Sequence, residues 1–199
     1  MEKNYIKFNC NWIKGKVIEK EKLTELNYWR NKLFELNLIG AYSDGIGFGN
    51  ISERSSGNKF IISGSVTGGI KKLSEKHFTE VTEFNFEENS LTCVGPIKAS
   101  SESLTHAAIY KSLPEINAVI HVHNLKLWNY LLEKVPATKK EAEYGTPEMA
   151  KEMIRLLKEK ETREKKIIVM KGHKEGVISF GRNFDKAGEV LLKYFEETK

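Results

Sequence analysis

The sequence has little cysteine and proline and no long apolar run. Cys10 and Cys93 are the only two cysteines among 199 residues, too few and too far apart for a disulfide framework or a zinc ribbon. We expect both to be free thiols in a reducing cytoplasm. No stretch approaches the roughly 20 apolar residues that cross a bilayer. Residues 1–5 include an acid and precede no apolar segment, so the sequence predicts no signal peptide and a cytoplasmic location.

A strong excess of one charge is also missing. The chain has 32 basic and 27 acidic side chains, a formal net charge of +5. Lysines alternate with glutamates in the runs 19–22 and 158–161, a pattern typical of solvated helix faces with local pairs of opposite sign. The charge therefore indicates neither a nucleic-acid partner nor a membrane surface, although it can help to attract an anionic substrate.

No repeat, low-complexity tract or flexible linker divides the chain, which predicts a single domain over 1–199. Leucines at helical spacing predict a helix from Leu23 to Leu36 with Gly40 as its stop signal, and Thr146 with Pro147 predicts the start of another. We expect a closing helix over 183–196 and strands at 60–62, 118–123, 166–170 and 177–180, with a hairpin over 83–94. Short connections between neighbouring strands favour an α/β fold with an antiparallel or mixed sheet.

Two histidines lie one residue apart in the apolar, β-branched segment 118–123. Because alternate side chains of a strand point to the same face, His121 and His123 project together and can converge on one ion. Two histidines near a strand end can equally be structural, with hydrogen bonds to the backbone. The pair alone leaves both interpretations open.

A third histidine favours the metal site. His173 follows an apolar segment and lies between Gly172 and Gly176, which permit a tight turn. Three histidines with a fourth position open to water or substrate are typical of a catalytic zinc. Manganese, cobalt or iron could substitute, because imidazole binds all of them. We interpret His77 and His106 as structural.

Three small polar segments could bind an anion. Ser100-Ser101-Glu102 begins a predicted helix that runs to about Tyr110, with Ser100 or Ser101 as its N-cap. Hydroxyls and free amides at a helix N-terminus form a phosphate site, although a glutamate there is also an ordinary helix residue. The loops at 49–52 and 67–68 could add donors to the same anion, while each loop alone is more typical of a simple turn.

Five motifs, at 49–52, 65–68, 100–102, 118–124 and 172–173, occur in a fixed order along the chain. In this order they resemble the class II aldolase/adducin family, and within it the L-fuculose-1-phosphate aldolase-like proteins. The resemblance extends from about Leu23 to Tyr194, nearly the whole chain. Five ordered motifs are far more specific than any one of them.

The resemblance implies a three-layer αβα fold with a mainly antiparallel central sheet, and a cyclic homotetramer with active sites at subunit borders. It implies a zinc-dependent aldolase, a lyase that cleaves or forms a small phosphorylated ketose through an enediolate. Related ribulose-phosphate epimerases tend to carry aspartate where Glu102 stands, so glutamate favours an aldolase. An epimerase or dehydratase acting on a related sugar phosphate is an alternative, and a non-catalytic adducin-like scaffold is another.

The resemblance also assigns roles to residues. The zinc ligands would be His121, His123 and His173, and Glu102 would be the carboxylate that alternates between the metal and proton transfer. The phosphate pocket would be formed by Asn50, Thr67, Gly68, Ser100 and Ser101.

The chain departs from the family pattern in two places. The usual His-His-Gly at the third ligand is replaced by the run 172–176, Gly-His-Lys-Glu-Gly. The segment between Asn124 and Tyr144 is short, and no tyrosine aligns with the one that, in the aldolases, comes from a neighbouring subunit and transfers the proton at the aldehyde oxygen. We therefore expect a slow lyase of broad specificity, or a different reaction on a related substrate, unless a neighbouring subunit contributes Tyr130 or Tyr144.

Overall fold

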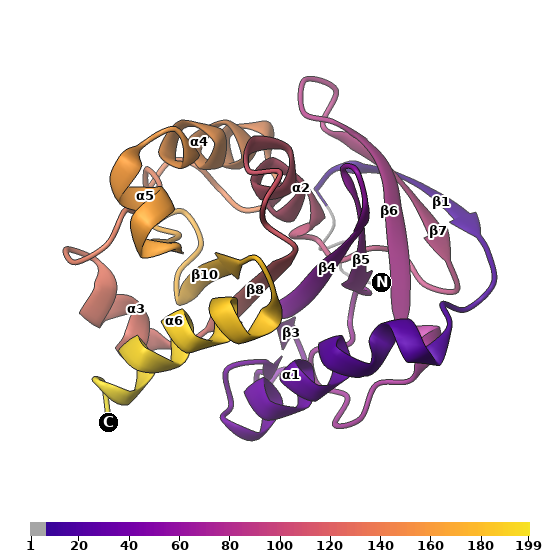
Figure 1. The fold of residues 1–199 in the computed structure, drawn as a ribbon, viewed down its shortest axis with the longest axis horizontal. Helices are drawn as coiled ribbons and strands as arrows, with labels where there is room; N and C mark the ends of the chain where they lie inside the picture. The colour runs from indigo at the N-terminus through magenta and orange to yellow at the C-terminus, as the bar shows by residue number, and fades with distance from the viewer. Residues whose placement is uncertain (1–6) are drawn as a thin grey trace.

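The centre of the fold is a twisted sheet of eight strands, seen in a computed structural model that describes residues 7–199 (Figure 1). Every neighbouring pair in this sheet is antiparallel except β1 with β7. In spatial order the strands are β1 (Asn9–Lys14), β7 (Ser90–Gly95), β6 (Phe78–Asn85), β5 (Lys59–Ser63), β4 (Asn50–Ser56), β8 (Ala118–His123), β10 (Gly176–Gly181) and β9 (Ile167–Val169). A small hairpin of β2 (Gly40–Ala41) and β3 (Gly47–Phe48) stands apart from it.

Helices cover both faces of the sheet and enclose two separate apolar cores. One core contains side chains from α1 (Thr24–Glu35), α3 (Leu125–Leu131) and α6 (Phe184–Glu196). The other contains side chains from α2 (Ser103–Ser112) and α4 (Pro147–Leu157). The short helix α5 (Lys160–Lys165) and the 3-10 turns η1 (Lys20–Leu23) and η2 (Glu75–His77) complete the described helices. The predicted three-layer αβα fold with a mainly antiparallel sheet is confirmed.

In strand β8, the sequence determines which side chains face each of the two apolar cores. Ala118, Ile120 and Val122 belong to the core under α1 and α6, whereas Val119 belongs to the core under α2 and α4. Successive side chains of a strand alternate between faces, so His121 and His123 share the face of Val119. Both histidines therefore point toward the side of the sheet where α2 begins.

Two predicted helix starts are confirmed. Thr146 is the N-cap of α4, where its Oγ1 accepts the Met149 amide at 3.4 Å, with Pro147 as the first helical residue. Asn183 is the N-cap of α6, where its Oδ1 accepts the Lys186 amide at 3.0 Å.

Two residues expected to stop or cap a helix do not do so. The first helix ends close to the predicted Leu36, but the residue that stops it is Asn37, whose φ of 56° is left-handed, and not Gly40, which lies in β2. Asn37 replaces the expected glycine because it tolerates this conformation. Ser100 and Ser101 lie before α2, and Glu102 occupies the N-cap position with no side-chain cap. The Ser100 hydroxyl instead accepts the Glu102 amide at 3.4 Å.

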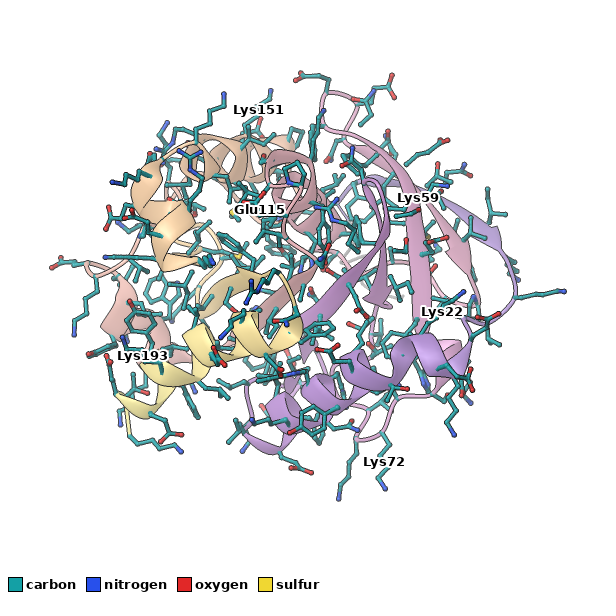
Figure 2. All side chains as sticks on the ribbon, viewed as in Figure 1. Lys22, Lys59, Lys72, Glu115, Lys151 and Lys193 are labelled. Carbon is teal, nitrogen blue, oxygen red and sulfur yellow. The ribbon has the colours of Figure 1, made fainter. Side chains whose placement is uncertain are left out.

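The charged side chains are dispersed. Figure 2 shows the labelled lysines Lys22, Lys59, Lys72, Lys151 and Lys193 well separated from one another in the view. Among residues 7–199, no helix is both long and apolar enough to cross a membrane.

The contact between α6 and α1 gives a stability prediction. A Cβ added at Gly188 of α6 would lie 2.1 Å from ring atoms of Trp29 in α1. Alanine in a helix is favoured over glycine by about 1 kcal/mol, but overpacking a core costs about 1–3 kcal/mol. We expect Gly188→Ala to lower the free energy of unfolding by up to about 2 kcal/mol in urea titrations. Glu189→Ala, at an exposed position of the same helix, is the control; a stabilised Gly188→Ala protein would contradict the close contact.

Candidate functional site

Three histidine side chains meet where the central strand β8 ends and its neighbour β10 begins. The Nε2 atoms of His121 and His123, on β8, are 3.1 Å apart, and His123 Nε2 is 3.0 Å from Nε2 of His173. His173 lies in the turn between β9 and β10, and β10 pairs with β8 so that Gly176 faces His123. This pairing brings a residue 50 positions away along the chain to the two histidines of the strand.

Hydrogen bonds leave the Nε2 atoms of two rings free of protons. The Nδ1 atom of His121 lies 3.3 Å from the carbonyl oxygen of Val177, so it carries the proton. The hydroxyl of Tyr42 donates to Glu175 at 2.8 Å and lies 2.9 Å from Nδ1 of His123. Since the one hydroxyl proton goes to the carboxylate, His123 Nδ1 must donate to the Tyr42 oxygen. The Nε2 lone pairs of both rings therefore point toward each other.

The donor set fits a bound divalent ion. Burial lowers the pKa of His121 to about 4 and the pKa values of His123 and His173 well below their usual range, so all three rings are neutral, as metal ligands must be. Two buried lone pairs 3.1 Å apart repel each other unless a cation lies between them. Nitrogens bound to a tetrahedral zinc at about 2.05 Å are about 3.3 Å apart, close to the separations found here.

Glu102 lies beside the histidines with one oxygen unused. Its side chain is 3% exposed, and Oε1 lies 3.7 Å from Nε2 of His173. Oε2 accepts a hydrogen bond from Thr105 Oγ1 at 2.9 Å, whereas the buried Oε1 has no partner among residues 7–199. Burial raises the pKa of Glu102 to about 7, although the Thr105 hydrogen bond lowers it in part. A carboxyl group with this pKa can both accept and donate a proton near neutral pH.

The five residues predicted to bind phosphate line the same cavity as the histidines and Glu102. The cavity has a volume of about 230 Å³, and its walls include Asn50, Thr67, Gly68, Ser100 and Ser101. Asn50 begins β4 and pairs with His121 across the sheet, and its buried Oδ1 has no partner among the described residues. The hydroxyl of Thr67 donates to the Gly64 carbonyl at 2.8 Å, so only its lone pairs remain for a ligand. All nine residues predicted for the site are thus brought together.

Tyr130 and Tyr144, the two tyrosines that the sequence offered as proton donors, lie in different places. Tyr144 lines the cavity of its own chain, with its ring centroid 4.4 Å from that of His173. The ammonium of Lys7 lies 4.0 Å from the centre of the Tyr144 ring. Tyr130 is not among the residues that line the cavity, and its hydroxyl donates to Glu197 at 2.8 Å. Tyr144 therefore reaches the site without a neighbouring subunit.

His77 and His106 lie outside this cavity. His77 Nδ1 accepts the Ser74 amide at 2.8 Å. His106 is fully buried, with Nδ1 2.6 Å from the Ser52 hydroxyl. Both positions suit the structural interpretation of these residues.

Sequence reasoning missed Tyr42 and Glu175, which support His123 from behind. Tyr42 follows β2, its ring packs on Phe48, and Phe48 stacks on His123 with centroids 5.6 Å apart. Glu175 has a left-handed φ of 71°, which strains a residue that is not glycine. The available signal was the departure from His-His-Gly, because Glu175 is one of the residues that separate His173 from the next glycine.

Comparison with known proteins identifies the family and the fold. Residues 41–197 match the family model described as Class II Aldolase and Adducin N-terminal domain. Curated proteins yield no match. A solved L-fuculose 1-phosphate aldolase superposes with a TM-score of 0.66 and 19% identity over 92% of this chain and 84% of its own.

Two further solved structures have the same fold. The L-fuculose-1-phosphate aldolase from Thermus thermophilus gives a TM-score of 0.64 at 20% identity, over 90% of this chain and 91% of that chain. The sugar-phosphate aldolase from Thermotoga maritima gives 0.64 at 17% identity, over 90% and 94%.

The support behind His123 yields a prediction about metal affinity. Groups that orient a metal-binding imidazole typically contribute about 10–100-fold to affinity. We expect Tyr42→Phe to weaken zinc binding by about that factor in a chelator competition with the metal-free protein. Tyr28→Phe, at a 62% exposed position of α1, is the matched control. Equal zinc affinity in Tyr42→Phe and the natural protein would contradict the role of the hydroxyl.

Glu175→Gly separates this role from a structural one. Glycine relieves the left-handed backbone at position 175, so the thermal midpoint should stay equal or rise while zinc affinity falls. A purely structural Glu175 would show the opposite order, with lower stability and unchanged affinity.

Proposed function

Because this chain belongs to the class II aldolase and adducin family, we propose that it is a zinc-dependent lyase that cleaves or forms a small phosphorylated ketose. The observation that carries the proposal is the buried Oε1 of Glu102, which has no partner among the described residues and lies beside three converging imidazoles. A phosphate held by the Thr67–Gly68 loop and the Ser100–Ser101 turn would place the sugar's carbonyl end toward the histidines. A cavity of about 230 Å³ suits a small ketose.

In this proposal, each residue of the site has its own chemical role. A zinc ion held by His121, His123 and His173 would supply Lewis-acid stabilisation of the enediolate charge. In the direction of bond formation, Glu102 removes a proton from the carbon beside the carbonyl, and this carbon then attacks an aldehyde. The aldehyde oxygen receives a proton from Tyr144. Cleavage runs the same steps backward, so Glu102 returns the proton to carbon.

Tyr144 takes the place of the missing family tyrosine in this proposal. The Lys7 ammonium lies 4.0 Å from the centre of its ring, a cation–π contact that helps to hold the ring in place. A donor within the same chain removes the reason for expecting a slow, unselective enzyme. We also propose that the chain forms a single domain over 1–199. We further propose that it assembles as a cyclic homotetramer with active sites at subunit borders.

The burial of the site argues against an inert scaffold. Three imidazoles and a carboxyl group without full partners cost folding free energy when buried. In a protein that only binds partners, nothing would offset this loss of folding free energy. An epimerase or dehydratase would use the same Glu102 and the same metal, so only product analysis with a panel of ketose phosphates separates those reactions from aldol cleavage.

The first test addresses Glu102. Glu102→Gln keeps the shape of the side chain but cannot accept and return a proton. We expect zinc content and substrate binding to stay nearly normal while turnover falls by about 10²-fold or more. Turnover equal to that of the natural protein would leave Glu102 as an ordinary residue at the start of α2.

The second test separates the two tyrosines. Tyr144→Phe should lose aldol cleavage by about 10²-fold or more but keep proton exchange at the carbon beside the carbonyl, because Glu102 performs that step. Solvent deuterium incorporation measures the exchange. Tyr130→Phe is the matched control and should retain both activities. Normal cleavage by Tyr144→Phe would exclude it as the proton donor.

A further inference from the structure

A buried arginine lies behind the loop assigned to phosphate. Arg30 in α1 is 1% exposed. Its Nη2 donates to the carbonyl oxygens of Thr67 and Gly68 at 3.2 and 2.9 Å, and its Nη1 donates to that of Lys71 at 2.8 Å. Thr67 and Gly68 line the cavity, whereas Arg30 does not. The loop therefore lies between the guanidinium and the cavity.

The arginine sets the direction of the loop's peptide groups. In a trans peptide the carbonyl and the following N–H point in opposite directions, and the described residues contain no cis peptide. Because the Thr67 carbonyl points at Arg30, the Gly68 N–H points away from it, toward the cavity side of the loop. Within residues 7–199, neither this amide nor that of Gly69 donates a hydrogen bond. Such free amides suit an anion.

The loop needs an anchor because its conformation is strained. Val66, which is 72% exposed, has a φ of 62°, a rare conformation for a β-branched residue. A glycine-containing loop with one residue in this region would relax without contacts that hold it. Three charge-assisted hydrogen bonds from one rigid guanidinium provide those contacts.

The charge of Arg30 has no acidic partner among the described residues, where no carboxylate oxygen lies within 4.0 Å. Burial lowers the pKa of Arg30 to about 10, so the group is still charged at neutral pH. A buried cation without a counter-ion is costly to maintain. An anion on the other side of the loop would offset that cost.

We propose that Arg30 is a positioning residue for the substrate phosphate: it holds the Thr67–Gly68 loop with its amides toward the cavity and supplies an unpaired positive charge behind them. The proposal rests on the proposed function, because it takes this loop as the phosphate end of the cavity. It predicts that Arg30 affects the affinity for phosphate without contacting it.

Arg54 provides a matched control. Its guanidinium also donates to backbone carbonyls, those of Ile116, Tyr110 and Leu113 at 2.8, 2.9 and 3.0 Å. It does not line the cavity. Arg54→Met thus removes a similar structural clamp elsewhere in the molecule.

The experiment measures the dissociation constant for inorganic phosphate by calorimetry on the zinc-loaded protein. Arg30→Met should weaken phosphate binding by about 10-fold or more, with unchanged zinc content, whereas Arg54→Met should bind phosphate like the natural protein. Arg30→Gln, which keeps one donor but no charge, should weaken phosphate binding similarly and replaces Arg30→Met if that variant does not fold. Arg30→Lys should lose less affinity than either, because the charge remains.

The outcomes separate the role of Arg30 from the phosphate pocket and from the proposed function. Natural affinity in Arg30→Met or Arg30→Gln would overturn the role of Arg30 while leaving the phosphate pocket intact. Equal weakening in Arg54→Met would also overturn it, since general loosening would then explain the effect. No phosphate binding by the natural protein would refute both the pocket and the role of Arg30, whereas unchanged turnover in Glu102→Gln would count against the proposed function alone.

Discussion

The structure depends on one constraint: three neutral imidazoles, two buried and one partly buried, must lie with their Nε2 atoms facing one another. Two of these lone pairs, on His121 and His123, repel at 3.1 Å unless a cation joins them, so the surrounding protein has to hold the rings in place. The pairing of β8 with β10 fixes the distance between the strand and the His173 turn. The Val177 carbonyl and the Tyr42 hydroxyl fix which nitrogen carries the proton in His121 and in His123. The geometry of the candidate metal site is therefore a consequence of sheet register and of two hydrogen bonds behind the histidines.

The cavity has two chemically different ends, and Glu102 lies between them. At one end neutral nitrogen donors suit a divalent cation. At the other, backbone amides and hydroxyls suit an anion, with the Arg30 charge behind the loop. A substrate with an oxygen pair at one end and a phosphate at the other would satisfy both, and its reacting carbon would then lie near the carboxyl group. Binding energy from the phosphate can thus be used to orient a bond that the phosphate does not touch.

Local sequence patterns predicted the structural features that depend only on residues near one another in the chain. The two-residue period of β8 placed His121 and His123 on one face, and Thr146 and Asn183 begin their helices as cap residues do. Contacts between distant segments were not predictable in this way. Tyr42 meets Glu175 across 133 residues, and Arg30 meets Gly68 across 38, so no spacing rule connects them. The polar edge strand β1 and the left-handed Asn37 were missed for a related reason: tertiary pairing and backbone conformation, rather than hydrophobic period, decide them.

X-ray absorption spectroscopy of the zinc-loaded protein tests the central claim most directly, because it reports the atoms bound to the metal. The account predicts one zinc per chain with three imidazole nitrogens at about 2.0–2.1 Å, completed by oxygen. His173→Ala should reduce the imidazole contribution to two. Sulfur from Cys10 or Cys93 in the coordination sphere, or a spectrum unchanged by His173→Ala, would contradict it.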